Sequence, residues 1–195
     1  MSRPRSRSTP FAILGLLGFE PMSGYDIRKE VAASIGYFWS ESYGQIYPAL
    51  RELSRDGLIR VKPGTPEGGR ERRVYEITAK GRRTLAAWRA EPPRPAPVRN
   101  ELLLKLFFGA PGGSGGEIAW LEALATKEAA QRREFRRIRR QLLEERRDHP
   151  SLPYWLAVVA YGEHHSRAAL RWARETSSAL RGLGTARRKR GPLHE

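Results

Sequence analysis

The sequence predicts a mainly α-helical protein with a small β-hairpin, and three observations carry this prediction. Apolar residues recur at helical spacing over most of the chain. Alternating apolar and polar residues, which are typical of strands, occur at 58–62 and 73–78. A proline-rich stretch, 92–99, separates a first half of short mixed elements from a second half of long helical patterns. The expected organisation is therefore two domains joined by a linker.

The amino-acid composition argues against disulfide-rich, membrane-spanning and secreted proteins. The chain has 195 residues, no cysteine and a net charge of +15. Without cysteine there is no disulfide framework, no thiolate metal site and no cysteine nucleophile. No apolar run is long enough to span a membrane and the basic start lacks a signal-peptide core, so a cytoplasmic protein with no membrane partner is expected. The charge suits a polyanion such as nucleic acid, and the alternative is a solvated arginine-rich surface.

The first two helices are predicted from local signals. Residues 11–19 are apolar on most faces and predict a buried helix that ends at Pro21. Ser23 stands three residues before Asp26, which is the spacing of a capping box at the start of a second helix.

A third helix is predicted within SYGQIYPALRELSRDGLI, residues 42–59. Its apolar face comprises Ile46, Leu50 and Leu53. Gly57 supplies a left-handed stop. Pro48 is costly deep inside a helix, so the helix is expected to start near Gly44 or Gln45 rather than at the beginning of the segment.

The two predicted strands, 58–62 and 73–78, flank a turn-rich tip at 63–72 and are followed by a helix at 79–89. The order is then helix, helix, helix, strand, loop, strand, helix. This is the plan of a winged helix-turn-helix, a fold that lays its third helix in the major groove of DNA and its hairpin tip on the adjacent backbone.

The outer face of the third helix and the wing carry groups that suit DNA. Gln45 can present a donor and an acceptor to a base edge, Tyr47 can donate to phosphate, and Arg51 can reach phosphate or guanine. The predicted DNA-binding residues are Ser42, Tyr43, Gln45, Tyr47, Pro48, Arg51, Arg70, Arg72 and Arg73. Two alternatives remain: a winged helix used as a protein-interaction module, with the two tyrosines as half-buried aromatics, and nonspecific nucleic-acid binding through arginine-rich tails.

Three segments, FAILGLLGFEPMSGYDIRKEV, SYGQIYPALRELSRDGLI and GGRERRVYEITAKGRRTL, resemble the PadR family of bacterial transcription regulators. The resemblance covers residues 11–90, and the remainder resembles more loosely the helical C-terminal domain of longer PadR-type proteins. It implies a homodimeric DNA-binding regulator, usually a repressor and often released by a small molecule. The family's recognition-helix motif falls on residues 45–50 and its wing on residues 69–73.

The second half predicts a helical domain. Residues 100–108 are apolar and are expected to be buried. Long helices are predicted at 117–148 and from 154 to about 180. The apolar stripe of the first comprises Leu121, Leu124, Phe135, Ile138 and Leu142, with Glu128 and Gln131 at intervening positions. Two helices with exposed apolar stripes indicate a partner, and a homodimer through these C-terminal helices is the expected solution.

Arginines crowd the helix predicted at 117–148: Arg132, Arg133, Arg136, Arg137, Arg139, Arg140, Arg146 and Arg147. One interpretation is further contact with the DNA backbone. The favoured interpretation is a solvated helix face that pairs with Glu134, Glu144 and Glu145.

No catalytic residue, metal site or cofactor is expected. His164 and His165 are adjacent, so on a helix they point about 100° apart and cannot share a metal. The chain has no HExxH, no GxSxG and no phosphate-binding loop after a strand. A small aromatic effector is a further hypothesised partner, in a pocket at the dimer interface lined by Trp120, Tyr154, Trp155, Tyr161 and Trp172, and the alternative is that these aromatics only pack the core.

The predicted domain boundaries follow from these patterns. They are a disordered basic tail at 1–9, a winged helix-turn-helix at 10–91, a proline-rich linker at 92–99, a helical dimerisation and effector domain at 100–181, and a disordered basic tail at 182–195.

Overall fold

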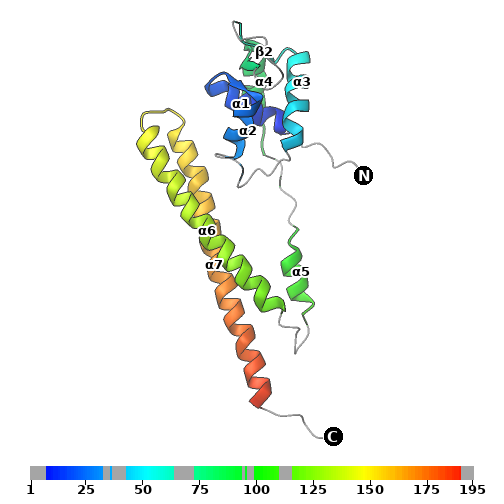
Figure 1. Ribbon diagram of the computed structural model, residues 1–195, viewed down its shortest axis with the longest axis vertical. Coiled ribbons are helices and arrows are strands. Elements are labelled where there is room, and N and C mark those ends of the chain that lie inside the picture. Colours follow the sequence, from blue (N-terminus) through cyan, green and yellow to red (C-terminus); the bar gives the residue numbers. More distant parts are fainter. Residues whose placement is uncertain are drawn as a thin grey trace. The chain divides into compact units, whose positions relative to one another are not determined.

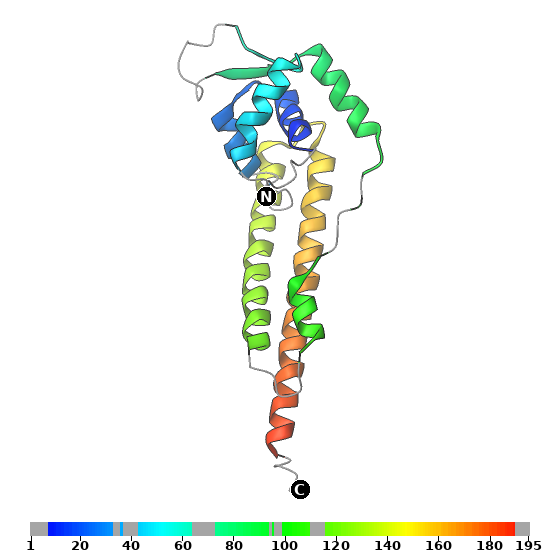
Figure 2. The ribbon, with the colours of Figure 1, turned by 90° about the vertical axis from the view of Figure 1, so that its right-hand side faces the viewer.

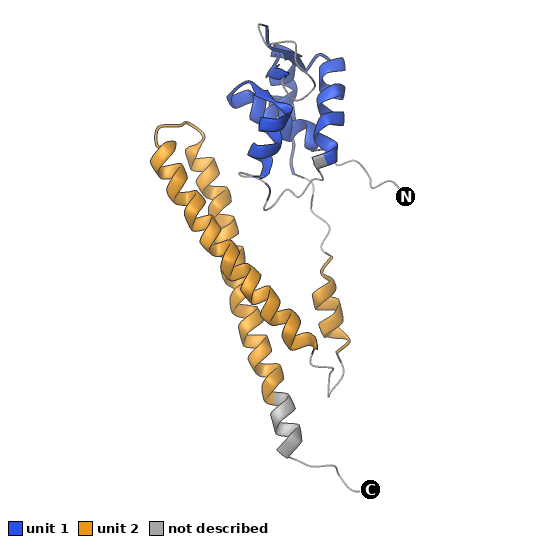
Figure 3. Cartoon of the chain, in the orientation of Figure 1, with its two compact units in different colours: residues 1–96 blue, residues 97–195 orange. Residues whose placement is uncertain are grey.

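The chain divides into two compact units, residues 1–96 and residues 97–195 (Figure 3). The computed structural model describes residues 8–32, 36, 43–63, 73–93, 95, 99–109 and 116–189, with side chains for all of these except 43 and 183–189. The boundary between the units falls inside the predicted linker at 92–99.

Unit 1 is mainly helical and carries a small sheet (Figure 1). Its described elements are α1 (Thr9–Phe19), β1 (Met22–Ser23), α2 (Gly24–Glu30), the 3₁₀-helix η2 (Tyr43–Gln45), α3 (Ile46–Arg55), β2 (Ile59–Val61), β3 (Val74–Ile77) and α4 (Ala79–Ala90). The predicted winged helix-turn-helix order and the mainly α fold class are confirmed.

The sheet contains one strand more than the predicted hairpin. All strands are antiparallel in the order β1-β3-β2, with Met22 opposite Tyr75 and Ile59 opposite Ile77. The added strand, β1, has only two residues. A strand this short has no alternation to detect in the sequence, and only its pairing with β3 defines it.

The core of unit 1 forms around α1, which packs against α2, α3, α4 and β3. The most deeply buried side chains come from four elements: Ile13, Leu14, Leu17, Ile27, Leu50 and Ile59. Phe11 of α1 also stacks on Trp88 of α4, with ring centroids 4.7 Å apart. Because α1 meets neighbours on several sides, it is apolar around most of its circumference rather than along a single stripe.

The predicted local signals at the helix ends are confirmed. The Ser23 hydroxyl accepts a hydrogen bond from the Asp26 backbone at 3.1 Å, and the Asp26 carboxylate accepts one from the Ser23 backbone at 3.2 Å. Gly57 follows α3 with φ 68°, a left-handed conformation that glycine adopts without cost. The structure adds a cap at the start of α4, where the Thr78 hydroxyl accepts a hydrogen bond from the Gly81 backbone at 3.1 Å.

Unit 2 consists of α5 (Glu101–Phe107), α6 (Gly116–Glu145) and α7 (Leu152–Lys189), with α6 and α7 forming an antiparallel hairpin (Figure 2). The seam between α6 and α7 buries Leu121, Phe135, Val159 and Leu170. Across this seam Arg139 of α6 forms an ion pair with Glu163 of α7 at 2.6 Å.

One expectation for unit 2 was wrong. The helix predicted to end near 180 continues to Lys189, so residues 182–189 are helical rather than part of a disordered tail, and residues 190–195 lie outside the described residues. A helix that is already formed propagates readily through alanine and arginine, so isolated glycines near its end do not stop it. Within the single chain, the apolar segment expected to be buried at 100–108 is uncovered: α5 has no buried residue, and Phe107 and Phe108 are 81% and 74% exposed.

No helix in the described part of the chain combines the length and the apolar character needed to cross a membrane.

Candidate nucleic-acid interface

The third helix of unit 1, α3, separates a buried face from an outer one. Its buried side chains are Ile46, Ala49, Leu50 and Leu53. On the opposite side Pro48, Arg51 and Arg55 follow one another at three- and four-residue spacing, so they lie on one line along the helix. Both arginines are exposed and Pro48 is half-buried. We call these three residues the outer ridge of α3.

Pro48 occupies the third position of α3, because η2 spans the preceding residues and the α-helix begins at Ile46. The first four backbone N–H groups of an α-helix have no partner within the helix, so a proline in the first turn loses no intrahelical hydrogen bond there. The late helix start predicted from Pro48 is thereby confirmed. Gln45 lies at the N-cap, half-buried, and its side chain makes no capping hydrogen bond.

Tyr47 lies at the edge of the core, between the buried face of α3 and its outer face. Its ring is half-buried and packs against the hydrophobic cluster of unit 1. The structural role proposed as an alternative for this tyrosine is therefore present. The backbone of Tyr43 lies in η2, its side chain is outside the described residues, and so is Ser42.

The wing is built on β2 and β3, which pair Arg60 with Glu76 directly across the strands. The Arg60 Nε donates to the Glu76 carboxylate at 2.6 Å, so this cation has an anionic partner on the sheet. Arg73 is exposed immediately before β3. Arg70 and Arg72, at the wing tip, lie outside the described residues.

Arg55 is a candidate site residue that the sequence reasoning missed. Its side chain is 74% exposed, and its Nε contacts the adjacent Asp56 carboxylate at 3.2 Å. Arg55 lies four residues after Arg51 and seven after Pro48, and these intervals place residues on one face of a helix. The spacing could therefore have identified Arg55 as a candidate from the sequence.

The five aromatic residues predicted to bind an effector are spread over unit 2. Tyr154 and Tyr161 are 71% and 69% exposed, and Trp155 stacks on His149 near the hairpin tip. Trp120 lies near α5, with the Lys105 ammonium 5.3 Å from its ring centroid. Tyr154 and Trp172 are about 27 Å apart along α7, so one chain does not gather these side chains into a single pocket.

The arginines of α6 are partly paired. Arg137 pairs with Glu134 at 2.6 Å, as the favoured interpretation expected. Arg139 instead pairs with Glu163 of α7 through two hydrogen bonds, of 2.6 and 3.2 Å. These bonds hold the pKa of the Glu163 carboxyl below its ordinary value, against the opposing effect of partial burial.

The fold and the outer ridge define a winged helix-turn-helix protein with a helical C-terminal unit. Residues 13–87 match the family described as the transcriptional regulator PadR-like family, and residues 98–181 match the family described as virulence activator alpha C-term. The chain belongs to the PadR-like family of transcriptional regulators.

The sequence relatives are regulators too. The chain is 36% identical over 103 residues to the negative transcriptional regulator PadR of Bacillus subtilis, covering 52% of this chain and 57% of that protein. It is 38% identical over 86 residues to a probable transcriptional regulator of Mycobacterium tuberculosis, covering 44% and 46%. The chain thus matches about half the length of these curated relatives.

Solved structures resemble this chain over most of its length. Bacillus subtilis PadR in complex with operator DNA has a TM-score of 0.74 at 25% identity, covering 91% of this chain and 99% of that one. The Vibrio cholerae virulence activator AphA has a TM-score of 0.73 at 26% identity, covering 90% and 99%. The Bacillus subtilis protein in complex with p-coumaric acid has a TM-score of 0.69 at 24% identity, covering 89% and 99%.

Proposed function

We propose that this protein is a sequence-specific DNA-binding transcription regulator that acts in the cytoplasm as a homodimeric repressor. The observation that carries the proposal is the outer ridge of α3, where Pro48, Arg51 and Arg55 face away from a fully packed inner face. Membership of the PadR-like family and the operator complex of Bacillus subtilis PadR support it.

In this proposal α3 enters the major groove and the wing lies on the neighbouring backbone. Arg51 sits in the middle of the outer ridge, where a guanidinium can bind guanine or phosphate. Arg55 and Arg73 are exposed and suited to phosphate. Gln45 reads a base edge from the N-terminal end of α3, and Tyr47 contributes a hydroxyl while its ring stays packed.

Uncovered apolar surface in unit 2 supports the homodimer. On α5 and at its C-cap, Leu103, Leu104, Phe107 and Phe108 are between 48% and 81% exposed. On α7, Tyr154, Val158 and Tyr161 lie at three- and four-residue spacing and are also exposed. A second copy would cover both surfaces at once and would set two α3 helices about 34 Å apart, one turn of DNA.

We further propose that a small aromatic acid is the effector and that its binding releases the protein from DNA. The complex of Bacillus subtilis PadR with p-coumaric acid and the aromatic side chains of unit 2 motivate it. Such a ligand changes DNA binding only if it binds one conformation of the dimer, with one spacing of the two α3 helices, more tightly than it binds the other conformation. We expect the protein to lose operator binding when p-coumaric acid or a related phenolic acid is added. Unchanged operator binding with every phenolic acid tested would count against release by phenolic acids.

The first test compares binding to a duplex from upstream of the protein's own gene with binding to a scrambled duplex, at about 150 mM salt. The wild type should prefer the upstream duplex, and Arg51→Ala should lose most of this preference. The matched control is Arg89→Ala, which removes an exposed arginine from α4, a helix that packs on α1.

The rival functions predict other outcomes. Equal binding to both duplexes, abolished by trimming residues 1–9 and 182–195, would indicate nonspecific binding through the arginine-rich termini. Absence of binding to either duplex would favour a protein-interaction module. Repression rather than activation is tested with a reporter under the upstream promoter, whose output should rise when the protein is removed.

A further inference from the structure

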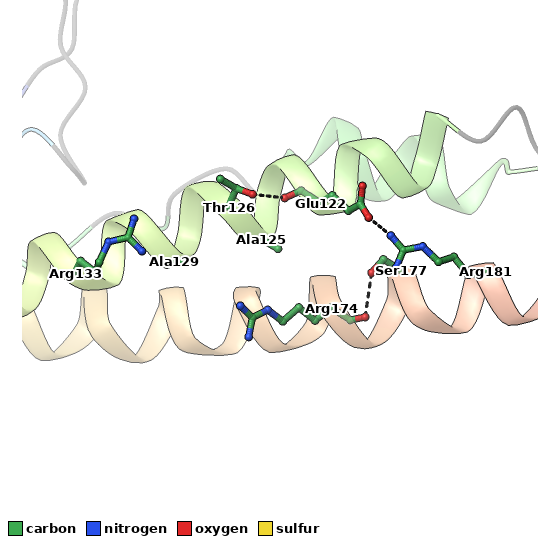
Figure 4. A pocket seen from close by; sticks show the side chains of 8 residues that line it. All are labelled: Glu122, Ala125, Thr126, Ala129, Arg133, Arg174, Ser177 and Arg181. Carbon is green, nitrogen blue, oxygen red and sulfur yellow. Dashed lines mark hydrogen bonds and ion pairs between the residues drawn. The ribbon is translucent and has the colours of Figure 1, made fainter.

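A groove of about 710 Å³ runs along one side of the seam between α6 and α7 (Figure 4). Its walls include small side chains, Ala125 and Ala129 on α6 and Ser177 on α7. The Ser177 hydroxyl donates to the backbone carbonyl of Arg174 at 3.1 Å, so it folds back onto its own helix. These small residues leave space between the two helices that larger side chains would fill.

Arginines from both helices line the same groove. Arg133 comes from α6, and Arg174 and Arg181 come from α7 (Figure 4). The groove has one acidic residue, Glu122, and it forms an ion pair with Arg181. The guanidinium groups of Arg133 and Arg174 form no ion pair with any carboxylate in the described part of the chain.

These two arginines differ from others on the hairpin. Arg137 and Arg139 each have a carboxylate partner, Glu134 and Glu163. Arg133 and Arg174, by contrast, line one groove from opposite helices, and neither has a carboxylate partner in the described part of the chain. An arginine without a carboxylate partner on a convex surface is ordinarily solvated, but two arginines that line one groove can bind the same anion.

We propose that the groove binds a small organic molecule through a carboxylate or phosphate group held between Arg133 and Arg174. The planar guanidinium presents several N–H donors in a geometry that matches both groups. Ala125 and Ala129 offer a short apolar surface for the rest of the molecule. The volume lies within the range of about 300–1,000 Å³ that is usual for small-molecule sites. A molecule bound here links α6 to α7.

The test uses the full-length protein without DNA, so its outcome is independent of the proposed regulatory function. Benzoate, citrate, inorganic phosphate and inorganic pyrophosphate are titrated by calorimetry, each against chloride at equal ionic strength. At least one probe should bind the wild type. Arg133→Gln and Arg174→Gln should each weaken binding by roughly five- to tenfold, because each removes one charged contact in a solvent-exposed site.

The matched control is Arg140→Gln, which removes the same charge from an exposed position of α6 outside the groove. Its binding should stay within about twofold of the wild type. An equal loss in this control would overturn the proposal, because it would mean that binding follows net charge. The absence of any binding above the chloride reference would overturn it as well. Comparing the carboxylate probes with the phosphate probes identifies the preferred group.

A second variant tests the same site by gain of affinity. Glu122→Gln removes the groove's carboxylate and frees Arg181 for the ligand. Binding should become roughly threefold tighter or more, since a repulsive charge is lost and a guanidinium is released. Glu134→Gln frees Arg137 outside the groove and should have little effect. Unchanged or weaker binding in Glu122→Gln would contradict the assignment.

Discussion

The ring of Tyr47 packs so closely on Gly24 that a β-carbon at Gly24 would lie 2.8 Å from the ring carbon Cε1. Gly24 is the first residue of α2 and Tyr47 is the second residue of α3, so this contact limits how near the two helices of the helix-turn-helix can approach. The same β-carbon would lie 3.3 Å from Leu50 Cδ1 in the core. A side chain at position 24 therefore has no free space to occupy.

Gly24→Ala should lower the free energy of unfolding by about 1–3 kcal/mol, because an added methyl group must displace a packed ring. It should also weaken DNA binding, since Tyr47 and α3 have to shift. The control is Gly15→Ala in α1, where a β-carbon meets nothing within 4 Å. That change should raise stability by about 0.5–1 kcal/mol. Urea denaturation measures both, and equal stability of the two variants would refute the tight contact.

Arg55→Gln should weaken binding to operator and scrambled duplexes alike, because an exposed arginine at the end of the outer ridge is suited to phosphate. The slope of log affinity against log salt should fall in magnitude by about one. Arg89→Gln on α4 should leave the slope unchanged. A slope that stays the same in Arg55→Gln would place this residue away from DNA.

Phe107→Ser combined with Phe108→Ser should weaken self-association by at least about tenfold, because exposed phenylalanines on α5 are expected to be covered by the second copy. Sedimentation equilibrium of the full-length protein measures the dissociation constant. Phe19→Ser removes a phenylalanine that is 52% exposed in unit 1 and should leave the dimer intact. A dimer that is unaffected by the α5 substitutions would exclude α5 from the interface.

Glu128→Leu should stabilise the protein. Glu128 is 6% exposed in the seam of the hairpin, and its Oε2 atom has no hydrogen-bond partner in the described part of the chain. Burying a polar group without a partner costs about 1–3 kcal/mol, so an apolar side chain should raise the melting temperature by about 2–6 °C. Glu144→Leu, at an exposed position, should change it little. A lower melting temperature in Glu128→Leu would indicate that the carboxylate gains a partner in the dimer.

The ion pair of Arg139 and Glu163 should make stability depend on pH. Hydrogen bonds from Arg139 lower the pKa of Glu163 below the ordinary 4.5, so the folded state binds this proton less readily than the unfolded state. The stabilisation is therefore complete above about pH 5 and is lost as pH falls through the lowered pKa. Arg139→Gln should cost about 0.5–1 kcal/mol near neutral pH, and this difference should shrink as the pH falls through the lowered pKa of Glu163. A difference that is constant with pH would point to packing instead.

The features that were predicted correctly from the sequence depend on interactions between residues close together in the chain. The capping box of Ser23 and Asp26, the left-handed Gly57 and the late start of α3 before Pro48 each depend on residues a few positions apart. The inner face of α3 followed from the helical period alone. The candidate site was therefore foreseen at Arg51 and Pro48, which lie opposite that face. Arg55 shares the same period and was overlooked.

Contacts between distant segments explain what was not foreseen. The pairing of β1 with β3 joins residues about fifty positions apart, and the ion pair of Arg139 with Glu163 crosses from one helix to another. The sequence predicted a DNA contact for the Tyr47 hydroxyl. The packing of the Tyr47 ring on the core depends on Gly24, which has no side chain in the space that the ring occupies. The groove between Arg133 and Arg174 likewise exists only because α6 and α7 lie side by side.

The helices, their caps, the wing strands and the family resemblance could all be predicted from the order of residues, because hydrophobic period, capping and turn chemistry act over short stretches of chain. The folded chain was needed to show which arginines have carboxylate partners, which aromatic rings are packed and which apolar surfaces stay uncovered on α5. The physical reason is that ion pairing and burial depend on distances between segments, and the order of residues along one helix does not specify those distances.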